Sequence, residues 1–155
     1  MKIISHRGNI NGVVSEKENR PSYIDCALGL GYDVEVDIRY IDNKFWLGHD
    51  EPQYQLNEKW MLLRKDKLWF HCKNLDSSIK IQELSSDLKF FCHKQDDYVL
   101  TSVGKFWVHD LTNKIDQNCI IPLLSLTEIH NYDYSKKPFA ICTDYINDLK
   151  KYYYV

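Results

Sequence analysis

The chain has 155 residues, a length that supports one well-packed core, so we expect a single domain over residues 1–155. Apolar residues make up 44% of the sequence and charged residues 27%, and no run approaches the ~18 consecutive apolar residues of a membrane helix. This composition excludes a disordered or membrane-spanning protein. The net charge of -2 comes without a clustered basic face, which argues against a nucleic-acid partner.

The N-terminal sequence MKIISHRG has neither an h-region nor a small-residue cleavage site, so we expect no secretory signal and a cytoplasmic location. Three of the five cysteines, Cys72, Cys92 and Cys142, lie in apolar runs where cysteine commonly behaves as a small buried hydrophobic residue. Because the count is odd and no C-x-x-C pair occurs, we predict neither a disulfide framework nor a thiolate zinc site.

Short apolar runs rich in β-branched and aromatic residues recur along the chain and predict buried strands. These strands are predicted at residues 2–5, 33–40, 45–48, 68–71, 88–92, 106–109, 120–124 and 139–143. Helices are predicted for residues 21–30, where Pro21 opens the first turn, and for residues 76–84, where Asp76 is the expected cap. Strands that alternate with helices indicate βαβ units and a parallel sheet.

A full eight-stranded (β/α) barrel usually needs more than ~200 residues, which this chain does not have. We therefore predict an α/β fold of the reduced TIM-type (β/α) barrel kind, in which some helices are shortened or missing. The connections around Asn43, Gly104 and Asn113 are expected to be short.

Polar residues follow or end many of the predicted strands. Among them are five of the six histidines and two aspartates: His6, His49, His71, His93, His109, Asp110 and Asp144. The C-terminal ends of parallel strands share one edge of the sheet, and in barrels that edge carries the active site. We expect these groups to converge there, although any one of them can instead cap a loop. For His93 and His109 we favour that structural role, and for Asp110 both roles stay open.

Glu35 and Asp37 are two residues apart in a predicted strand, so their carboxylates lie on the same face. Two like charges in that position repel each other and are costly to desolvate, and a divalent cation would offset the cost. Oxygen ligands of this kind suit Mg²⁺, Ca²⁺ or Mn²⁺. For this pair alone, a solvent-facing position on an edge strand is an equally good interpretation.

His6, Arg7 and Gly8 end the first predicted strand, and His49 closes the run FWLG. Arginine offers a planar fork for a phosphate, and glycine lets the backbone turn sharply or approach a ligand. Two imidazoles beside a metal-bound phosphodiester could act as general base and general acid, because the ordinary histidine pKa lies near neutrality.

Together these motifs resemble the signature of the glycerophosphodiester phosphodiesterases. The segments that carry the resemblance are HRG at 6–8, EN at 18–19, EVD at 35–37, GHD at 48–50, HCK at 71–73 and ICTDY at 141–145. Their order and spacing agree closely through Asp50 and loosely beyond it. The family has a (β/α) barrel and uses a divalent cation to hydrolyse glycerophosphodiesters to glycerol 3-phosphate and an alcohol. The resemblance therefore implies a small-molecule phosphodiester as the substrate.

The resemblance also implies roles for individual residues. His6 and His49 would be the catalytic acid–base pair, and Glu35 and Asp37 would bind the metal. The substrate phosphate would be bound by Arg7 and Lys73, with Glu18 and Asn19 supporting the loop behind Arg7.

Three departures from the family pattern are visible. His71 stands where the family usually has a glutamate ligand, and an imidazole there would shift the metal preference toward Mn²⁺ or Zn²⁺ and away from Ca²⁺. Arg20 stands where the family prefers a small hydroxyl residue. The usual insertion between His49 and His71 is absent, which predicts a shallower and more open site.

Three functions stay open at this point. The leading hypothesis is metal-dependent phosphodiester hydrolysis. A related reaction would cleave phospholipid head groups by attack of an internal hydroxyl and give a cyclic phosphate. The third possibility is a non-catalytic or substrate-altered barrel that binds a phosphate ester, and the replaced glutamate and the absent insertion favour it. The sequence leaves the alcohol, the metal and the oligomeric state open.

Overall fold

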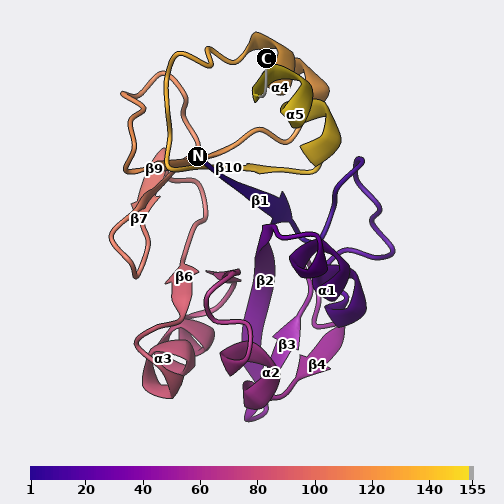
Figure 1. Cartoon of the computed structure of the whole chain (residues 1–155). Coiled ribbons are helices and arrows are strands. Elements are labelled where there is room, and N and C mark those ends of the chain that lie inside the picture. The colour runs from indigo at the N-terminus through magenta and orange to yellow at the C-terminus, as the bar shows by residue number, and fades with distance from the viewer. Residues whose placement is uncertain (154–155) are drawn as a thin grey trace.

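The structure of the chain is a computed structural model that describes residues 1–153 (Figure 1). Its strands are β1 (Lys2–His6), β2 (Asp33–Ile41), β3 (Lys44–Leu47), β4 (Tyr54–Leu56), β5 (Leu68–Cys72), β6 (Lys89–Phe91), β7 (Tyr98–Leu100), β8 (Phe106–Val108), β9 (Cys119–Pro122) and β10 (Ala140–Thr143). Its helices are α1 (Pro21–Gly29), α2 (Glu58–Leu62), α3 (Leu75–Leu84), α4 (Leu126–Asn131) and α5 (Ile146–Tyr153). None of these helices is long and apolar enough to cross a bilayer.

The strands form one curled sheet with a parallel centre. Within the described residues, the parallel strands pair in the order β6-β5-β2-β1-β10-β9-β8. The two ends of this series are linked through the segment after β7, where the Ser102 N–H donates to the Phe90 carbonyl oxygen at 2.9 Å. The parallel pairing confirms the predicted parallel sheet, and all carboxyl ends of these strands therefore lie at one edge.

The alternation of strands and helices would make the predicted strand at 45–48 a member of the parallel sheet, but in the structure it belongs to an antiparallel hairpin. It is β3, which pairs antiparallel with the second half of β2. Asp42 and Asn43, both at positive φ (50° and 58°), make the two-residue turn between them, as this kind of hairpin requires. The short connection predicted at Asn43 is thus confirmed, and the hairpin extends beyond the parallel sheet.

Two connections lack a helix, as the predicted reduction of the barrel requires. β6 is followed by the β7–β8 hairpin, which turns at Gly104 with φ 73°, and β8 is followed by a loop to β9. The turn at Gly104 is short, as predicted, but the prediction of a short connection at Asn113 is wrong, because that loop runs from residue 109 to 118. Helices follow the remaining crossovers and cover the outer face of the sheet.

The start of α1 agrees with the prediction from the local sequence, whereas the start of α3 differs from it. Pro21 opens α1, but Arg20 at its N-cap makes no side-chain capping hydrogen bond, which a small hydroxyl residue in its place could make. The cap of α3 is Asn74, whose side chain accepts a hydrogen bond from the Ser77 N–H, whereas Asp76, the predicted cap, lies in the first turn. α3 therefore begins at Leu75 instead of residue 76, and its cap lies two residues earlier than predicted.

Apolar side chains fill both faces of the sheet. The outer face packs against α1, α2 and α3 on one side of the molecule and against α4 and α5 on the other. The concave face holds a small core of its own: Ile4, Trp69, Phe91, Trp107, Ile120, Ala140 and Cys142. Because successive strand residues alternate between faces, the polar residues two positions further along β1 and β5, His6 and His71, also point to the concave side.

Candidate functional site

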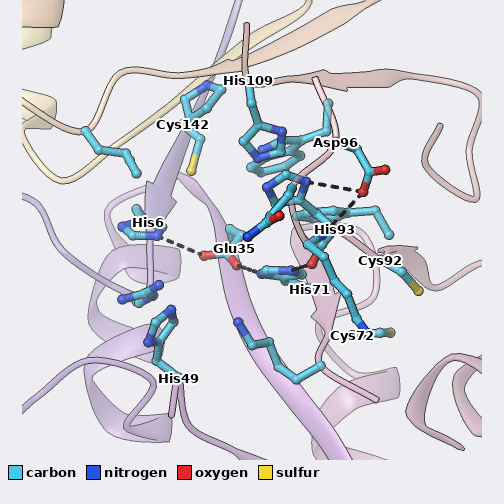
Figure 2. Close-up of a pocket in the computed structure, with 18 of the residues that line it drawn as sticks. His6, Glu35, His49, His71, Cys72, Cys92, His93, Asp96, His109 and Cys142 are labelled. Carbon is cyan, nitrogen blue, oxygen red and sulfur yellow. Dashed lines mark hydrogen bonds and ion pairs between the residues drawn. The ribbon is translucent and has the colours of Figure 1, made fainter. Parts of the chain in front are cut away.

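The centre of the site is a group of two carboxylates and one imidazole. Glu35 and Asp37 on β2 are buried, and His71 lies beside Asp37 in the parallel pairing of β2 with β5. His71 Nδ1 lies 3.7 Å from Glu35 Oε1 (Figure 2). The same nitrogen lies 3.1 Å from Asp37 Oδ1. One ligand atom from each of the three residues lies within 4.8 Å of the others. The shared face predicted for Glu35 and Asp37 is confirmed, and the alternative of a solvent-facing pair is wrong.

This group fits a divalent cation. Glu35 Oε2 and Asp37 Oδ1 are buried and accept no well-aligned hydrogen bond from the described residues. His71 Nε2 lies 3.3 Å from the His93 carbonyl oxygen, which can only accept, so Nε2 carries the proton and Nδ1 faces the two carboxylates. Metal-binding histidines are commonly oriented by such a bond to a backbone carbonyl. Two carboxylates and one imidazole suit Mn²⁺, Mg²⁺ or Zn²⁺.

The two carboxylates experience different electrostatic environments. Burial and the nearby charge of Asp37 raise the pKa of Glu35 above its ordinary value. Burial acts in the same direction on Asp37, but the close approach of His71 and the charge of Arg7 outweigh it, so the pKa of Asp37 is lowered. Asp37 is thus a stabilised anion, and Glu35 is the carboxylate whose charge the described residues compensate least. A bound cation would supply that compensation.

Asp37 also organises the cationic part of the site. Its Oδ2 accepts a hydrogen bond from Asn19 Nδ2 at 3.0 Å and lies 2.9 Å from Arg7 Nε, while its Oδ1 lies 3.5 Å from Lys73 Nζ. Arg7 Nη1 donates to Glu18 Oε2 at 3.1 Å. The structure therefore brings Arg7, Lys73 and Asn19 together around Asp37. Glu18 contacts the Arg7 side chain, and the Asn19 N–H donates to the Arg7 carbonyl oxygen at 3.1 Å.

His6 is held by a residue from the opposite end of the chain. Its Nδ1 lies 2.9 Å from Asp144 Oδ1, and its Nε2 lies 3.8 Å from Glu35 Oε2. Burial by itself would lower the pKa of His6, but the hydrogen bond to Asp144 and the Glu35 charge outweigh it, so the pKa is raised. Asn9 Nδ2 donates to Asp144 Oδ1 at 2.7 Å and to Glu18 Oε1 at 2.8 Å. Asn9 therefore connects the two carboxylates that hold His6 and Arg7.

His49 reaches the site from the loop after β3. Gly48 has φ 148°, and a side chain there would overlap the Glu51 carbonyl oxygen, so only glycine fits this turn. Arg39 holds the loop by donating to the Gly48 carbonyl oxygen and to the carbonyl oxygens of His49 and Asp50, at 2.6 and 2.9 Å. His49 Nδ1 lies 2.9 Å from Asp50 Oδ1, and burial together with the Arg7 charge lowers the pKa of His49.

Two residues of this arrangement, Arg39 and Asn9, were not predicted, and Asp144 was predicted to converge at this edge but was given no role. Asp144 follows a predicted strand, so its position carried a signal. Arg39 continues the alternation of Glu35 and Asp37 along β2, and the period of two would have placed it on their face. Asn9 shows no sequence signal, because its role depends on contacts with Glu18 and Asp144.

A cavity of about 1150 Å³ opens beside these groups. One side is lined by His6, Arg7, Glu35, His49 and Lys73, and another by His93, Lys94, Trp107 and His109. The rings of His93 and His109 stack with centroids 3.4 Å apart, and their Nδ1 atoms are buried without hydrogen-bond partners among the described residues. Asp110 instead accepts a hydrogen bond from the Thr112 N–H at 2.9 Å within its own loop, which favours the structural role for that residue.

The stacked histidines predict a pH-dependent stability. Burial and the neighbouring His93 lower the pKa of His109 to about 4. Because this lies below the ordinary value of 6.5, neutral His109 contributes stability that is complete above pH 6.5 and is lost as the pH falls toward 4. The ring is half-buried, so solvent screens part of this effect. Between about pH 7.5 and about pH 5, we expect the free energy of unfolding to fall by about 1 kcal/mol more in wild type than in His109→Gln.

Urea unfolding at the two pH values measures this difference, and His130→Gln, which alters an exposed histidine, serves as the matched control. The control should follow wild type. Equal losses in wild type and His109→Gln would show that His109 is not held neutral by its surroundings.

Taken together, the fold and the site define an α/β protein with a curled parallel sheet whose carboxyl edge carries a carboxylate–imidazole group next to a cavity. No protein-family model and no curated protein matches the sequence significantly. Among solved structures, the fold is similar to the crystal structure of a glycerophosphodiester phosphodiesterase from Agrobacterium tumefaciens. The TM-score is 0.58 at 13% sequence identity, over 97% of this chain and 98% of that chain. At this identity the likeness concerns the fold alone.

Proposed function

We propose that the chain hydrolyses phosphodiesters in a metal-dependent reaction, with a glycerophosphodiester as substrate and glycerol 3-phosphate and an alcohol as products. The observation that carries the proposal is the convergence of a cation-compatible group, two imidazoles and two cationic side chains around one cavity. The similarity in fold to a glycerophosphodiester phosphodiesterase supports it. We also infer that the curled sheet is a TIM-type (β/α) barrel reduced by the loss of the helices after β6 and β8.

Glu35, Asp37 and His71 would hold the divalent cation, which would supply positive charge to polarise the phosphodiester and stabilise the charge that develops on it. Arg7 and Lys73 add fixed positive charge at the same edge. Arg7 already pairs with Asp37 through Nε and with Glu18 through Nη1, which leaves Nη2 free of carboxylate contacts among the described residues. The guanidinium is therefore held in place before a phosphate arrives, which lowers the cost of binding one.

His6 and His49 supply the proton transfers. Asp144 orients His6 through Nδ1, and Asp50 occupies the same nitrogen of His49, so each imidazole keeps Nε2 available. One imidazole takes a proton from the attacking water, and the other returns a proton to the departing alcohol. Each imidazole thus has its own carboxylate partner, which orients the ring before the substrate binds.

Product analysis tests this function directly. Purified protein is incubated with glycerophosphocholine and, separately, with bis(p-nitrophenyl) phosphate, each in the presence of Mg²⁺, Mn²⁺, Ca²⁺ or Zn²⁺, and phosphorus NMR follows the products. We expect glycerol 3-phosphate and a clear dependence on the metal. A cyclic phosphate would instead indicate attack by an internal hydroxyl. Thermal stabilisation by glycerol 3-phosphate without turnover in any metal would overturn the proposal in favour of a phosphate-ester-binding protein.

A further inference from the structure

Two cysteines lie side by side at the ends of β5 and β6. These strands pair in parallel with His71 beside Phe91, so the next positions along the two strands are Cys72 and Cys92. Ser78 Oγ on α3 lies 2.9 Å from Cys92 Sγ. Neighbouring parallel strands are about 4.8 Å apart, which lies within the Cα separations that disulfides span. The pair is therefore placed for a disulfide with little movement of the backbone.

The two thiols differ in their access to solvent. Cys92 is exposed, which corrects the prediction that its apolar run would bury it, whereas Cys72 is 4% exposed. The exposure arises because Cys92 follows the last residue of the short strand β6, where no helix covers the connection. Cys26 is also exposed, and Cys119 and Cys142 are buried.

We propose that Cys72 and Cys92 form a reversible, hydroperoxide-sensitive thiol pair, in which Cys92 reacts first and Cys72 closes the disulfide. The Cys92 thiolate attacks one peroxide oxygen, so an S–O bond forms, the O–O bond breaks and Cys92 becomes a sulfenic acid. The departing alkoxide or hydroxide takes up a proton and leaves as alcohol or water. The Cys72 sulfur then attacks the sulfenic sulfur, and water leaves as the disulfide forms. Two thiols are oxidised, and one hydroperoxide is reduced.

The surroundings of Cys92 favour this order. Cys92 is exposed to a peroxide in solution, whereas Cys72 is 4% exposed. Reactive cysteines are accessible to solvent, whereas cysteines buried in apolar surroundings are inert, so Cys92 is the member of the pair that we expect to react first. Cys72 is covered by the core and by α3, which shield its thiol from solvent. Its thiol is therefore kept for reaction with the neighbouring oxidised Cys92.

The disulfide would also affect the candidate active site, and this part of the inference rests on the proposed function. Cys72 stands between His71, in the metal-binding group, and Lys73, which lies 3.5 Å from Asp37. Closing an S–S bond of about 2.05 Å ties the end of β5 to β6 and shifts both neighbours by a small distance. Because small displacements of positioned groups are costly, we expect turnover of a phosphodiester to fall by about tenfold or more on oxidation.

The test separates disulfide formation from activity. Fully reduced protein is treated with equimolar hydrogen peroxide, and intact mass, free-thiol titration and peptide mapping are compared in wild type, Cys92→Ser, Cys72→Ala and Cys26→Ser. We expect wild type and Cys26→Ser to lose two thiols and about 2 Da, with a Cys72–Cys92 crosslink that dithiothreitol reverses. Cys92→Ser should keep its thiols, and Cys72→Ala should accumulate sulfenic acid and higher oxidation products.

Retention of all five thiols in wild type, or a first reaction at Cys26, would overturn the proposal. So would progression of wild-type Cys92 to sulfinic acid at the rate found in Cys72→Ala. Mass and crosslink are read without any substrate, so a protein that forms the disulfide but hydrolyses no diester would contradict the proposed function and leave the thiol pair intact. If reduced protein is active, equal turnover before and after oxidation would refute the effect on the site.

Discussion

His6→Ala is expected to lower kcat/KM for a phosphodiester by about a thousandfold, the scale of a lost general acid or base. His6 lies at the carboxyl end of β1, where Asp144 holds Nδ1 and Nε2 lies 3.8 Å from Glu35 Oε2. Alanine removes the group that transfers the proton and leaves the cation-binding residues in place. Initial rates with bis(p-nitrophenyl) phosphate at saturating Mn²⁺ measure the effect, and thermal unfolding verifies that the variant is folded.

Two controls make this result specific. His130→Ala removes an exposed histidine on α4 and should retain the wild-type rate. Asp144→Asn keeps the size of its side chain but can no longer pair as an anion with His6, so we expect an intermediate loss and a shifted pH–rate profile. A His6→Ala variant that is folded and retains more than about a tenth of the wild-type rate would contradict acid–base catalysis by His6.

Opposite changes in stability are expected for the two carboxylates on β2. Asp37→Asn removes the anion that Arg7, Lys73 and His71 all approach, and the partly buried Arg7 loses its main partner. We expect a loss of about 3 kcal/mol in the free energy of unfolding. Glu35→Gln removes a charge that burial and Asp37 disfavour, so we expect a gain of about 1 kcal/mol in protein stripped of metal with EDTA.

The gain from Glu35→Gln has a defined pH dependence. The folded-state pKa of Glu35 is raised, so the wild-type penalty is absent below the unfolded value of 4.5 and develops as the pH rises through the folded pKa. The stability difference between Glu35→Gln and wild type should therefore shrink as the pH falls toward 4.5. Urea unfolding curves of EDTA-treated wild type and both variants at several pH values measure it.

Metal titration of wild type, Glu35→Gln and Asp37→Asn shows whether the two carboxylates bind a cation as well as affect stability. A cation at a hundredfold excess over its Kd stabilises the state that binds it by about 2.7 kcal/mol. Wild type should gain this amount with Mn²⁺ or a similar ion, whereas Glu35→Gln and Asp37→Asn should gain much less. If none of Mg²⁺, Mn²⁺, Ca²⁺ or Zn²⁺ raises the free energy of unfolding of wild type, the metal site is refuted. If Glu35→Gln is less stable than wild type in the absence of metal, the electrostatic account of Glu35 is refuted.

Several features of the fold could be predicted because they depend on neighbouring residues. Runs of β-branched and aromatic residues identified the parallel strands, and the period of two placed Glu35 and Asp37 on one face of β2. The positions of His6 and His71 at strand ends then predicted their convergence, since parallel strands bring their carboxyl ends to a common edge. The sequence alone therefore determined the parallel sheet, the edge that carries the site and most of the residues at that edge.

Other features depend on contacts between distant segments, and only the tertiary structure decided them. His49 reaches the site because β2 continues past the parallel sheet and β3 folds back along it, which the run FWLG does not reveal. Asp144 and Asn9 meet although 135 positions separate them, because β1 and β10 are paired neighbours. Cys92 is exposed because β6 ends one residue earlier and the connection that follows contains no helix. Local periodicity specifies which face a side chain takes, whereas pairing across the sheet decides which side chains it meets.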